Sequence, residues 1–206
     1  MKSSKSLKVV IALLILSLIS AGSYAQSRPW HIGLKAGANL FTVTGRSFEG
    51  KNKAGFSAGA YGEIKLSRMF YLQPELLFNQ ASTKTNDVFN QMYGQYGAIN
   101  SDVTLNYITL PVMIAFKPVP ELSILLGGQY GYLVNQTEGL LQTPPAGKKD
   151  AFSKSDAGIV FGGQLNLGKV RFSAKYVINV TDMNGINGSD LWRYHGFQFH
   201  LGYQIW

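Results

Sequence analysis

The sequence predicts an all-β fold, an eight-stranded antiparallel up-and-down transmembrane β-barrel. Three observations predict it: eight stretches alternate with period two, the glycines share the polar parity, and the connections alternate between short and long. Composition agrees, because the 206 residues include 23 glycines, 13% aromatic and only 15% charged residues, against about 25% charged in ordinary soluble domains. This composition argues against a disordered chain, a coiled coil or a helical bundle. The lack of cysteine excludes disulfides, thiolate metal sites and cysteine nucleophiles.

Residues 1–25 have the features of a secretory signal peptide. Three lysines precede the apolar run from Val9 to Ile19, and Ser23-Tyr24-Ala25 supplies small residues before the cleavage point. The run is shorter than the 20 or so residues of a transmembrane helix. We therefore expect cleavage after Ala25 and a barrel domain over residues 26–206, with 16 basic and 11 acidic groups. The basic residues are scattered, so nucleic-acid binding is not expected.

Each of the eight stretches places apolar residues on one parity, with no charged or amide side chain among them. The other parity carries charged residues, histidines, amides and nine glycines, and this alternation is typical of strands. The stretches cover residues 32–40, 56–66, 70–78, 108–116, 122–132, 157–167, 170–180 and 197–205.

Glycine placement favours a transmembrane barrel over a soluble lipocalin-like barrel, which would bury its large apolar side chains. The interior of an eight-stranded barrel is crowded, so small residues are expected to face inward. The apolar parity then faces lipid. The glycines that share the charged parity are Gly33, Gly37, Gly55, Gly59, Gly127, Gly131, Gly158, Gly162 and Gly202.

Seven charged side chains on the glycine parity are expected to form a polar network that plugs the lumen, because buried charges need partners of opposite sign. We expect a three-residue turn to pair Lys65 with Gln73. Glu63 would then face Glu75, with Lys35 on the adjoining strand available to neutralise the pair. The seven residues are Lys35, Glu63, Lys65, Glu75, Asp156, Arg171 and Lys175.

The connections alternate in length, as in outer-membrane barrels with short periplasmic turns and long extracellular loops. Both termini then lie in the periplasm, and Trp30 and Trp206 fall where an aromatic girdle belongs. Gly168-Lys169 suits a two-residue type II′ hairpin. The short connections are 67–69, 117–121 and 168–169, and the long ones are 42–54, 83–103, 135–155 and 181–195.

Two prolines lie inside neighbouring strands. Pro74 and Pro111 each lack an N–H, and a closed barrel has no edge at which that is harmless. We expect a β-bulge at these positions and weaker strand pairing along their shared seam.

Several segments resemble the PorT-like outer-membrane β-barrel proteins of Gram-negative bacteria. They are Gly33-Leu-Lys-Ala-Gly37, Tyr71-Leu-Gln-Pro-Glu-Leu-Leu-Phe78, Asn106-Tyr-Ile-Thr-Leu-Pro-Val-Met113 and the closing aromatic-glycine strand. The resemblance implies a small barrel in the outer membrane and makes both prolines expected features. It carries no catalytic residues, and it implies a link, for some members, to assembly of a secretion machinery for surface proteins. Trp206 departs from the family pattern because it falls one residue out of phase behind Ile205.

Several patterns suggest chemistry. Residues 55–59 match G-x-S-x-G, but that motif works on a sharp strand-to-helix turn, and here it lies along a strand. His31 and His200 share the lumen face of strands that pair on closure, so a His-Ser-acid group with Ser57 and Glu63 is conceivable. We favour a buried polar network, and keep a lipid-modifying barrel enzyme as an alternative.

The last loop supplies oxygen ligands of the kind that calcium prefers, in Asp182, Asn184, Asn187 and Asp190. Their spacing does not fit the EF-hand pattern, so a flexible polar loop without metal is expected. Gly147-Lys148-Lys149 lacks the Ser or Thr of a phosphate loop.

We therefore expect a protein that is not an enzyme and carries no cofactor or metal. Its role would be structural or interactive, through extracellular loops, with outer-membrane lipid and a protein at the cell surface or in the periplasm as partners. A small passive channel is a further alternative. The expected contact residues lie in loop 83–103, where aromatic side chains stand among amides; the alternative is that they pack the loop on itself or rest at the membrane interface. They are Phe89, Met92, Tyr93 and Tyr96.

Overall fold

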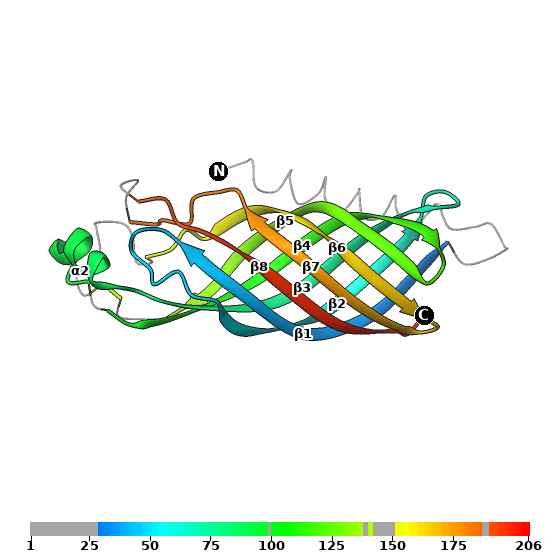
Figure 1. Ribbon diagram of the computed structural model, residues 1–206, viewed down its shortest axis with the longest axis horizontal. Helices are drawn as coiled ribbons and strands as arrows, with labels where there is room; N and C mark the ends of the chain where they lie inside the picture. The colour runs from blue at the N-terminus through cyan, green and yellow to red at the C-terminus, as the bar shows by residue number, and fades with distance from the viewer. Residues whose placement is uncertain (1–28, 99, 138–139, 142–150, 187–189) are drawn as a thin grey trace, which may run out of the picture. The chain divides into compact units, whose positions relative to one another are not determined.

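The computed structural model describes residues 29–98, 100–137, 140–141, 151–186 and 190–206. Eight strands form a closed antiparallel barrel in chain order, and the last strand pairs with the first (Figure 1). This confirms the predicted fold class. The expected signal peptide, residues 1–25, lies outside the described residues. The strands are β1 (Trp30–Thr44), β2 (Lys53–Lys65), β3 (Phe70–Lys84), β4 (Asp102–Val119), β5 (Leu122–Gln136), β6 (Ser155–Leu167), β7 (Val170–Asn179) and β8 (Arg193–Gln204).

Two short helices, α2 (Asp87–Tyr93) and η1 (Gly94–Tyr96), lie between β3 and β4. Asn86 caps α2, because its side-chain oxygen accepts hydrogen bonds from the N–H groups of Val88 and Phe89. Within the described ranges, no helix has the length and apolar character needed to cross a membrane.

The inward parity carries the glycines because the strands approach one another closely there. A Cβ atom at Gly37 would lie 1.8 Å from the Phe199 carbonyl oxygen, and one at Gly59 would lie 2.0 Å from that of Leu76. Either atom would overlap the backbone of the paired strand. The apolar parity is exposed along every strand, so it forms the outer surface of the barrel.

The strands are longer than predicted at the end that carries the long connections, and there the polarity of the two faces is exchanged. In β4, Leu105 and Tyr107 are buried inside while Thr104 and Asn106 lie on the outer face. From Ile108 onward the outer face is apolar. Beyond the membrane, apolar residues are buried on the inner face of the strand and polar residues face water. The period-two alternation therefore continues, but the apolar residues change from the outer face to the inner face.

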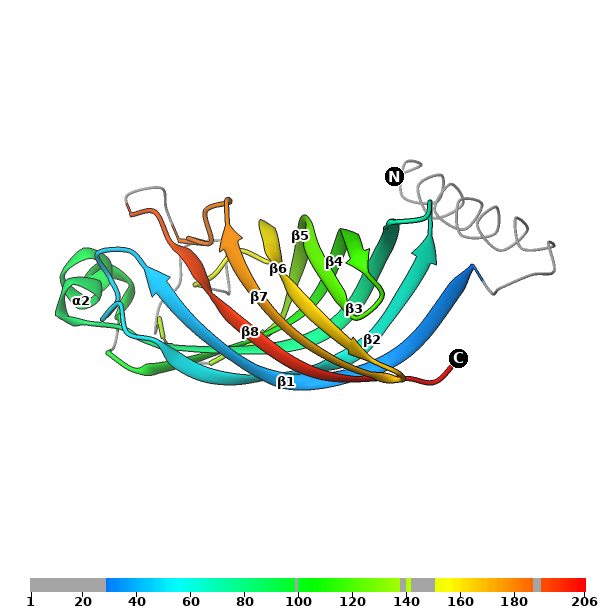
Figure 2. The same ribbon diagram turned by 45° about the vertical axis from the view of Figure 1, so that its right-hand side comes forward.

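The other end of the barrel carries the short turns (Figure 2). Val119 pairs with Leu122 across a two-residue turn, and Gly168 has the positive φ, 62°, that a primed hairpin turn needs. Lys117, expected in a turn, belongs to β4.

The prolines do not introduce the expected bulges. The register between β3 and β4 is the same on both sides of Pro74 and Pro111, and the register shifts lie instead between β4 and β5. The ladder is interrupted beside the prolines, however, because the pairing between β3 and β4 passes from Pro74–Val112 directly to Leu77–Thr109. The expected weaker pairing on this seam therefore agrees with the structure.

Candidate functional site

The lumen of the barrel contains a buried carboxylate, that of Glu75, between two lysines. Glu75 accepts hydrogen bonds from Lys35 Nζ at 2.6 Å and from Lys175 Nζ at 2.7 Å. Gln73 Nε2 donates to the same carboxylate at 2.8 Å. All four side chains are buried, with at most 4% exposed. Strands β1, β3 and β7 are thereby joined across the lumen by one ion-paired group.

A second group lies nearer the short turns. Lys117 Nζ approaches Glu63 Oε1 at 2.7 Å, and Arg171 lies 3.9 Å from the same oxygen. The Lys117 ammonium also lies 4.2 Å from the centre of the Tyr71 ring. Sequence reasoning missed Lys117 because it assigned residues 117–121 to a turn, although Lys117 shares the inward parity of β4.

The predicted register of the first hairpin is wrong by two residues. Lys65 pairs with Tyr71, not Gln73, and Tyr61 faces Glu75. Lys65 is exposed at the end of β2 and does not join the buried ion pairs, so its expected lumen position is also wrong. The connection holds four residues, 66–69, and the N–H groups of Leu66 and Ser67 both bond to the carbonyl of Phe70, the first residue of β3. The structure places the other six predicted network residues in the lumen: Lys35, Glu63, Glu75, Asp156, Arg171 and Lys175.

Asp156 lies apart from these groups, at the end of the lumen near the long connections. The Tyr194 hydroxyl donates to Asp156 Oδ1 at 3.3 Å and accepts from Gln129 Nε2 at 3.0 Å. Among the described residues, no lysine or arginine pairs with Asp156. A cavity of about 10 Å³ beside Gln129 and Gln198 has room for about one water molecule. Side chains therefore fill this part of the lumen.

Ser57 and His200 meet inside the barrel, with Ser57 Oγ 2.9 Å from His200 Nε2. The second ring nitrogen, Nδ1, has no hydrogen-bond partner in the described part of the chain, and Glu63 is engaged by Lys117. His31 bonds to Gln204 instead. Ser57 is completely buried on a straight run of β2. The pair thus lacks both the acid and the access that an activated serine requires.

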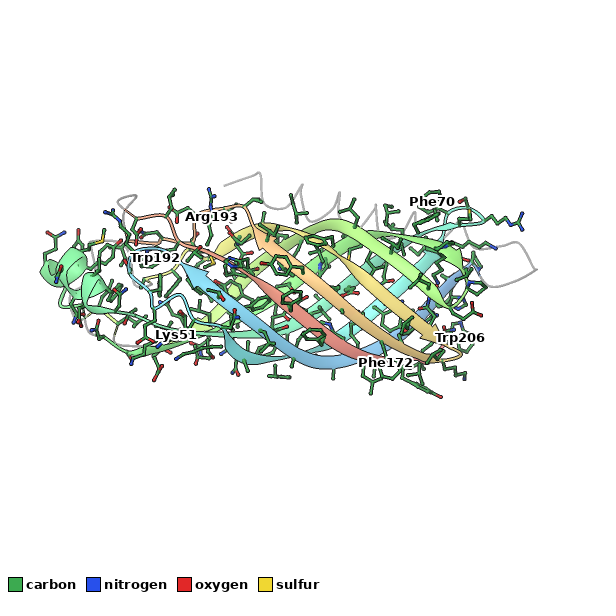
Figure 3. The ribbon with its side chains drawn as sticks, viewed as in Figure 1. Lys51, Phe70, Phe172, Trp192, Arg193 and Trp206 are labelled. Carbon is green, nitrogen blue, oxygen red and sulfur yellow. The ribbon has the colours of Figure 1, made fainter. Side chains whose placement is uncertain are left out.

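The long connections fold together into one unit, which we call the cap: residues 45–52, 85–101, 137–154 and 180–192, within the described ranges. Its centre is Trp192, which has no exposed surface and lies near Arg193 at the cap end of the barrel (Figure 3). Rings from the other three connections surround it. Ring-centre distances to Trp192 are 5.1 Å for Phe48, 5.1 Å for Phe152, 5.7 Å for Tyr93 and 6.1 Å for Phe89.

Backbone contacts tie the four connections to one another. Isolated β-bridges join Phe48 to Thr85, Ala98 to Leu141 and Phe152 to Asn184, so each connection is linked to the next. The cap also rests on the barrel, because the Tyr107 hydroxyl contacts the Met183 sulfur at 3.6 Å. The cap is a second hydrophobic core above the lumen.

Asp190 holds the first and last connections together. Its carboxylate accepts hydrogen bonds from the Ser47 hydroxyl at 2.8 Å, the Ser47 N–H at 3.1 Å and the Trp192 indole N–H at 3.2 Å. Burial alone would raise the pKa of Asp190, but these bonds and one from the Arg46 N–H hold that pKa below its usual value.

The oxygen-bearing side chains of the last loop, considered above as calcium ligands, form hydrogen bonds that hold the loop in place. Asp182 Oδ1 accepts from the N–H groups of Asn184 and Trp192 at 2.9 Å each. Because Asp182 and Asp190 are both engaged by backbone donors, the expectation of a flexible polar loop is wrong for these residues. Asn187, Lys148 and Lys149 lie outside the described residues.

The predicted loop contacts divide into two classes. Phe89 and Tyr93 are buried, at 1% and 0% exposed, and pack against Trp192, so they are core residues and not contact residues. Met92 and Tyr96 are half-buried against the same core. For Phe89 and Tyr93 the alternative of packing within the loop is therefore correct. Helix α2 places both on its inner face through their i, i+4 spacing.

Comparison with known proteins agrees with the barrel. The solved structure of Neisserial surface protein A (NspA) is similar, with a TM-score of 0.53 and 14% identity over 84% of this chain and 96% of that chain. Two further structures have TM-scores of 0.49: Ail of Yersinia pestis in complex with the heparin analogue sucrose octasulfate, with 14% identity over 85% of this chain and 99% of that chain, and OprG of Pseudomonas aeruginosa, with 9% identity over 85% and 95%.

No curated protein matches the chain. The model of one protein family does match, over residues 24–185, and its description is outer membrane protein beta-barrel domain. This match covers most of the sequence, including β1 to β7, and it agrees with the closed eight-stranded barrel. The chain therefore belongs to the outer membrane protein β-barrel domain family.

Proposed function

We propose that this outer-membrane protein is not an enzyme and that it recognises a partner protein through its cap. The observation that carries the proposal is the packing of all four long connections around Trp192. A folded cap presents a fixed surface, so binding does not have to order flexible loops first. The other surfaces are less suited, because the lumen is filled and the outer wall of the barrel faces lipid.

Charged residues of the cap and of the adjoining strand ends stand in defined positions. Glu49 of the cap accepts from Lys51 and from Lys84 of β3 at 3.2 Å, and Lys53 of β2 pairs with Asp102 of β4. These exposed pairs contribute little to stability, but they fix a charge pattern that a partner can match.

The proposed orientation places the cap outside the cell and both chain termini in the periplasm, after removal of a signal peptide. The resemblance to PorT-like proteins supports a partner in a machinery that secretes or assembles surface proteins. The buried Ser57–His200 pair, which lacks an acid, supports the non-enzymatic role over lipid modification.

Labelling of whole cells tests the orientation. Single cysteines at Lys51 and Gln95, both exposed in the cap, are expected to react with an impermeant reagent. Cysteines at Arg68 and Lys169, in the short turns, are expected to react only after the outer membrane is opened. Equal labelling of the two groups on intact cells would contradict the orientation.

Photo-crosslinking in living cells tests the recognition surface. A crosslinking amino acid at Gln91 or Gln95 is expected to capture a specific protein, whereas the same amino acid at Arg68 is not. A cap variant in which a short linker replaces residues 85–101 is expected to lose the cellular function. If that variant is normal while Ser57→Ala or His200→Ala abolishes function, the enzyme alternative is correct and our proposal is wrong.

A further inference from the structure

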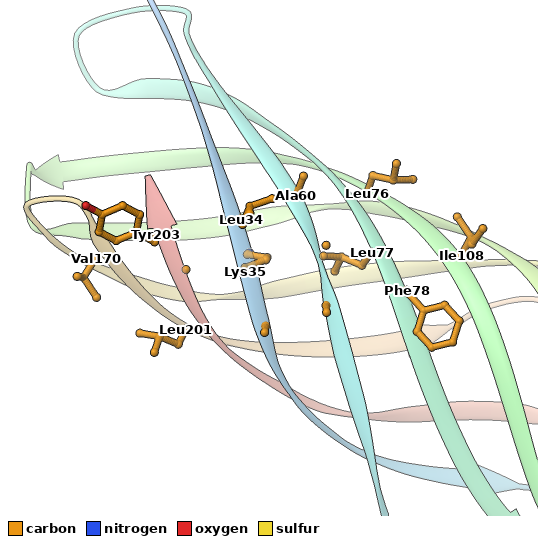
Figure 4. Close-up of a pocket in the computed structure, with 14 residues that line it drawn as sticks. Leu34, Lys35, Ala60, Leu76, Leu77, Phe78, Ile108, Val170, Leu201 and Tyr203 are labelled. Atoms are coloured by element: carbon orange, nitrogen blue, oxygen red, sulfur yellow. The ribbon is translucent and has the colours of Figure 1, made fainter. Parts of the chain in front are cut away.

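The apolar outer wall of the barrel is hollowed into a groove of about 930 Å³ (Figure 4). Small side chains form its floor, where Ala36 of β1 lies near Ala58 and Ala60 of β2. Larger side chains stand toward its two ends. They are Leu34, Val170, Leu201 and Tyr203 toward one end and Leu76, Phe78 and Ile108 toward the other.

The groove crosses the apolar band from edge to edge. At one end Val170 pairs with Tyr203, and Val170 directly follows the turn residue Lys169. At the other end Phe78 pairs with Ile108. The next outward residues toward the cap are polar, since Gln80 follows Phe78 on β3 and Asn106 precedes Ile108 on β4. The groove therefore runs between the two limits of the membrane-facing surface.

A cation lies beside the end of the groove near the turns, because Lys169 directly precedes the lining residue Val170. Lys169 is exposed and has no ion pair among the described residues, whereas Lys51 of the cap and Lys84 of β3 share Glu49. Tyr203 is 54% exposed and brings a hydroxyl to the same end. An aromatic ring with a polar tip is typical of the boundary between lipid chains and headgroups.

We propose that this groove binds one anionic phospholipid, with an acyl chain along the alanine floor and the phosphate at Lys169 and the Tyr203 hydroxyl. A flexible chain can follow a recess between leucine and phenylalanine side chains. The convex wall of a second barrel would meet those side chains first and leave the floor empty. The positive charge of Lys169 is opposite to that of a phosphate. Lys169 is therefore expected to attract the headgroup of an anionic lipid.

The experiment is native mass spectrometry of the full chain, released from nanodiscs of phosphatidylcholine with an equal share of phosphatidylglycerol. The wild-type protein is expected to retain one phosphatidylglycerol molecule. The groove-filling variant Ala58→Leu/Ala60→Leu is expected to lose it. Lys169→Gln is expected to lower the preference for phosphatidylglycerol about five-fold and to keep a bound lipid.

Matched controls separate the groove from general effects. Ala174→Leu adds the same side chain to an exposed alanine of β7 outside the groove, and Arg68→Gln removes a cation from another short turn. Both should behave as wild type, and the shift in gel mobility on heating shows that each variant is folded. The proposal fails if the groove variant keeps its lipid, if the controls lose theirs equally, or if the wild type emerges as a dimer that the groove variant disrupts. These outcomes leave the role of the cap untouched, because no groove residue belongs to it.

Discussion

At the scale of single residues, Asp190 holds the first and last connections of the cap together. Its folded-state pKa lies below the unfolded value of 3.8, so its contribution to stability is fully present above about pH 3.8 and is lost as the pH falls through the folded pKa. The indole of Trp192 donates to this carboxylate at 3.2 Å, so the fluorescence of Trp192 reports on the contact.

Asp190→Asn is expected to destabilise the cap by about 1.5–3 kcal/mol, the range for hydrogen bonds to a charged group. The measurement is Trp192 fluorescence in a background with Trp30→Phe and Trp206→Phe, followed from pH 7 to pH 3. The wild-type signal should change toward the acid end of this range, while the variant should already be altered at pH 7. A variant with the wild-type profile would contradict the role of Asp190.

Glu75 has a different part, because it neutralises two buried lysines at once. Glu75→Gln would leave Lys35 and Lys175 without a counter-charge, and removal of one partner from a buried ion pair costs about 3–5 kcal/mol. Urea unfolding in lipid vesicles measures the loss. The exposed Glu121→Gln is the control and should stay within about 0.5 kcal/mol of wild type. Equal stability of both variants would show that Glu75 is not essential to the lumen network.

At the scale of the elements, the sequence predicts the membrane-spanning strands well because one physical rule governs all of them. Lipid requires apolar residues on the outer parity, and the crowded lumen requires glycine on the inner one. The rule reverses outside the membrane. Val43 and Val103 therefore point inward from positions predicted to lie in loops, and Leu105 does so from a position before the predicted strand. The sequence alternates with period two in these segments as well, but the apolar residues occupy the parity that is polar in the adjoining membrane-spanning part of the strand.

The candidate site was harder to predict than the fold. Parity alone identifies Lys35, Glu75 and Lys175 as inward, but their pairing depends on register. The true register differs by two residues from the predicted one, so Glu63 does not face Glu75. The core around Trp192 joins four connections that are far apart in sequence. No local pattern predicts which side chains of a loop pack against the neighbouring loops. The sequence therefore does not distinguish the buried Phe89 and Tyr93 from the more exposed Met92 and Tyr96.

The proline seam between β3 and β4 is the element expected to be least stable within the barrel wall. Across this seam pairing is absent at Glu75, opposite Pro111, and present at Leu77, which pairs with Thr109. The amide proton of Glu75 should therefore exchange faster than that of Leu77. Pro111→Ala restores an N–H at the seam and should slow exchange at Glu75, as measured by NMR in nanodiscs. Uniform protection along both strands would contradict this expectation.

At the scale of the whole molecule, the chain builds two cores of opposite design. Inside the membrane the barrel encloses a polar core held by ion pairs, and outside it the cap encloses an aromatic core around Trp192. The aromatic side chains of Phe41, Tyr107 and Tyr194 lie where the two cores meet. Within the described residues, the cap therefore stands on a barrel whose lumen is lined by buried, paired side chains.

The last prediction follows from this arrangement and concerns transport. The purified protein should show no steady porin-like conductance in planar bilayers, because paired side chains fill the lumen and the cavity near Gln129 holds about one water molecule. A variant in which a short linker replaces residues 85–101 should also be silent, since the lumen is blocked by the barrel's own side chains and not by the cap. A porin in the same bilayer is the positive control. Steady conductance of the wild type would favour the alternative of a passive channel. Conductance of the cap variant alone would show that the cap closes a pore.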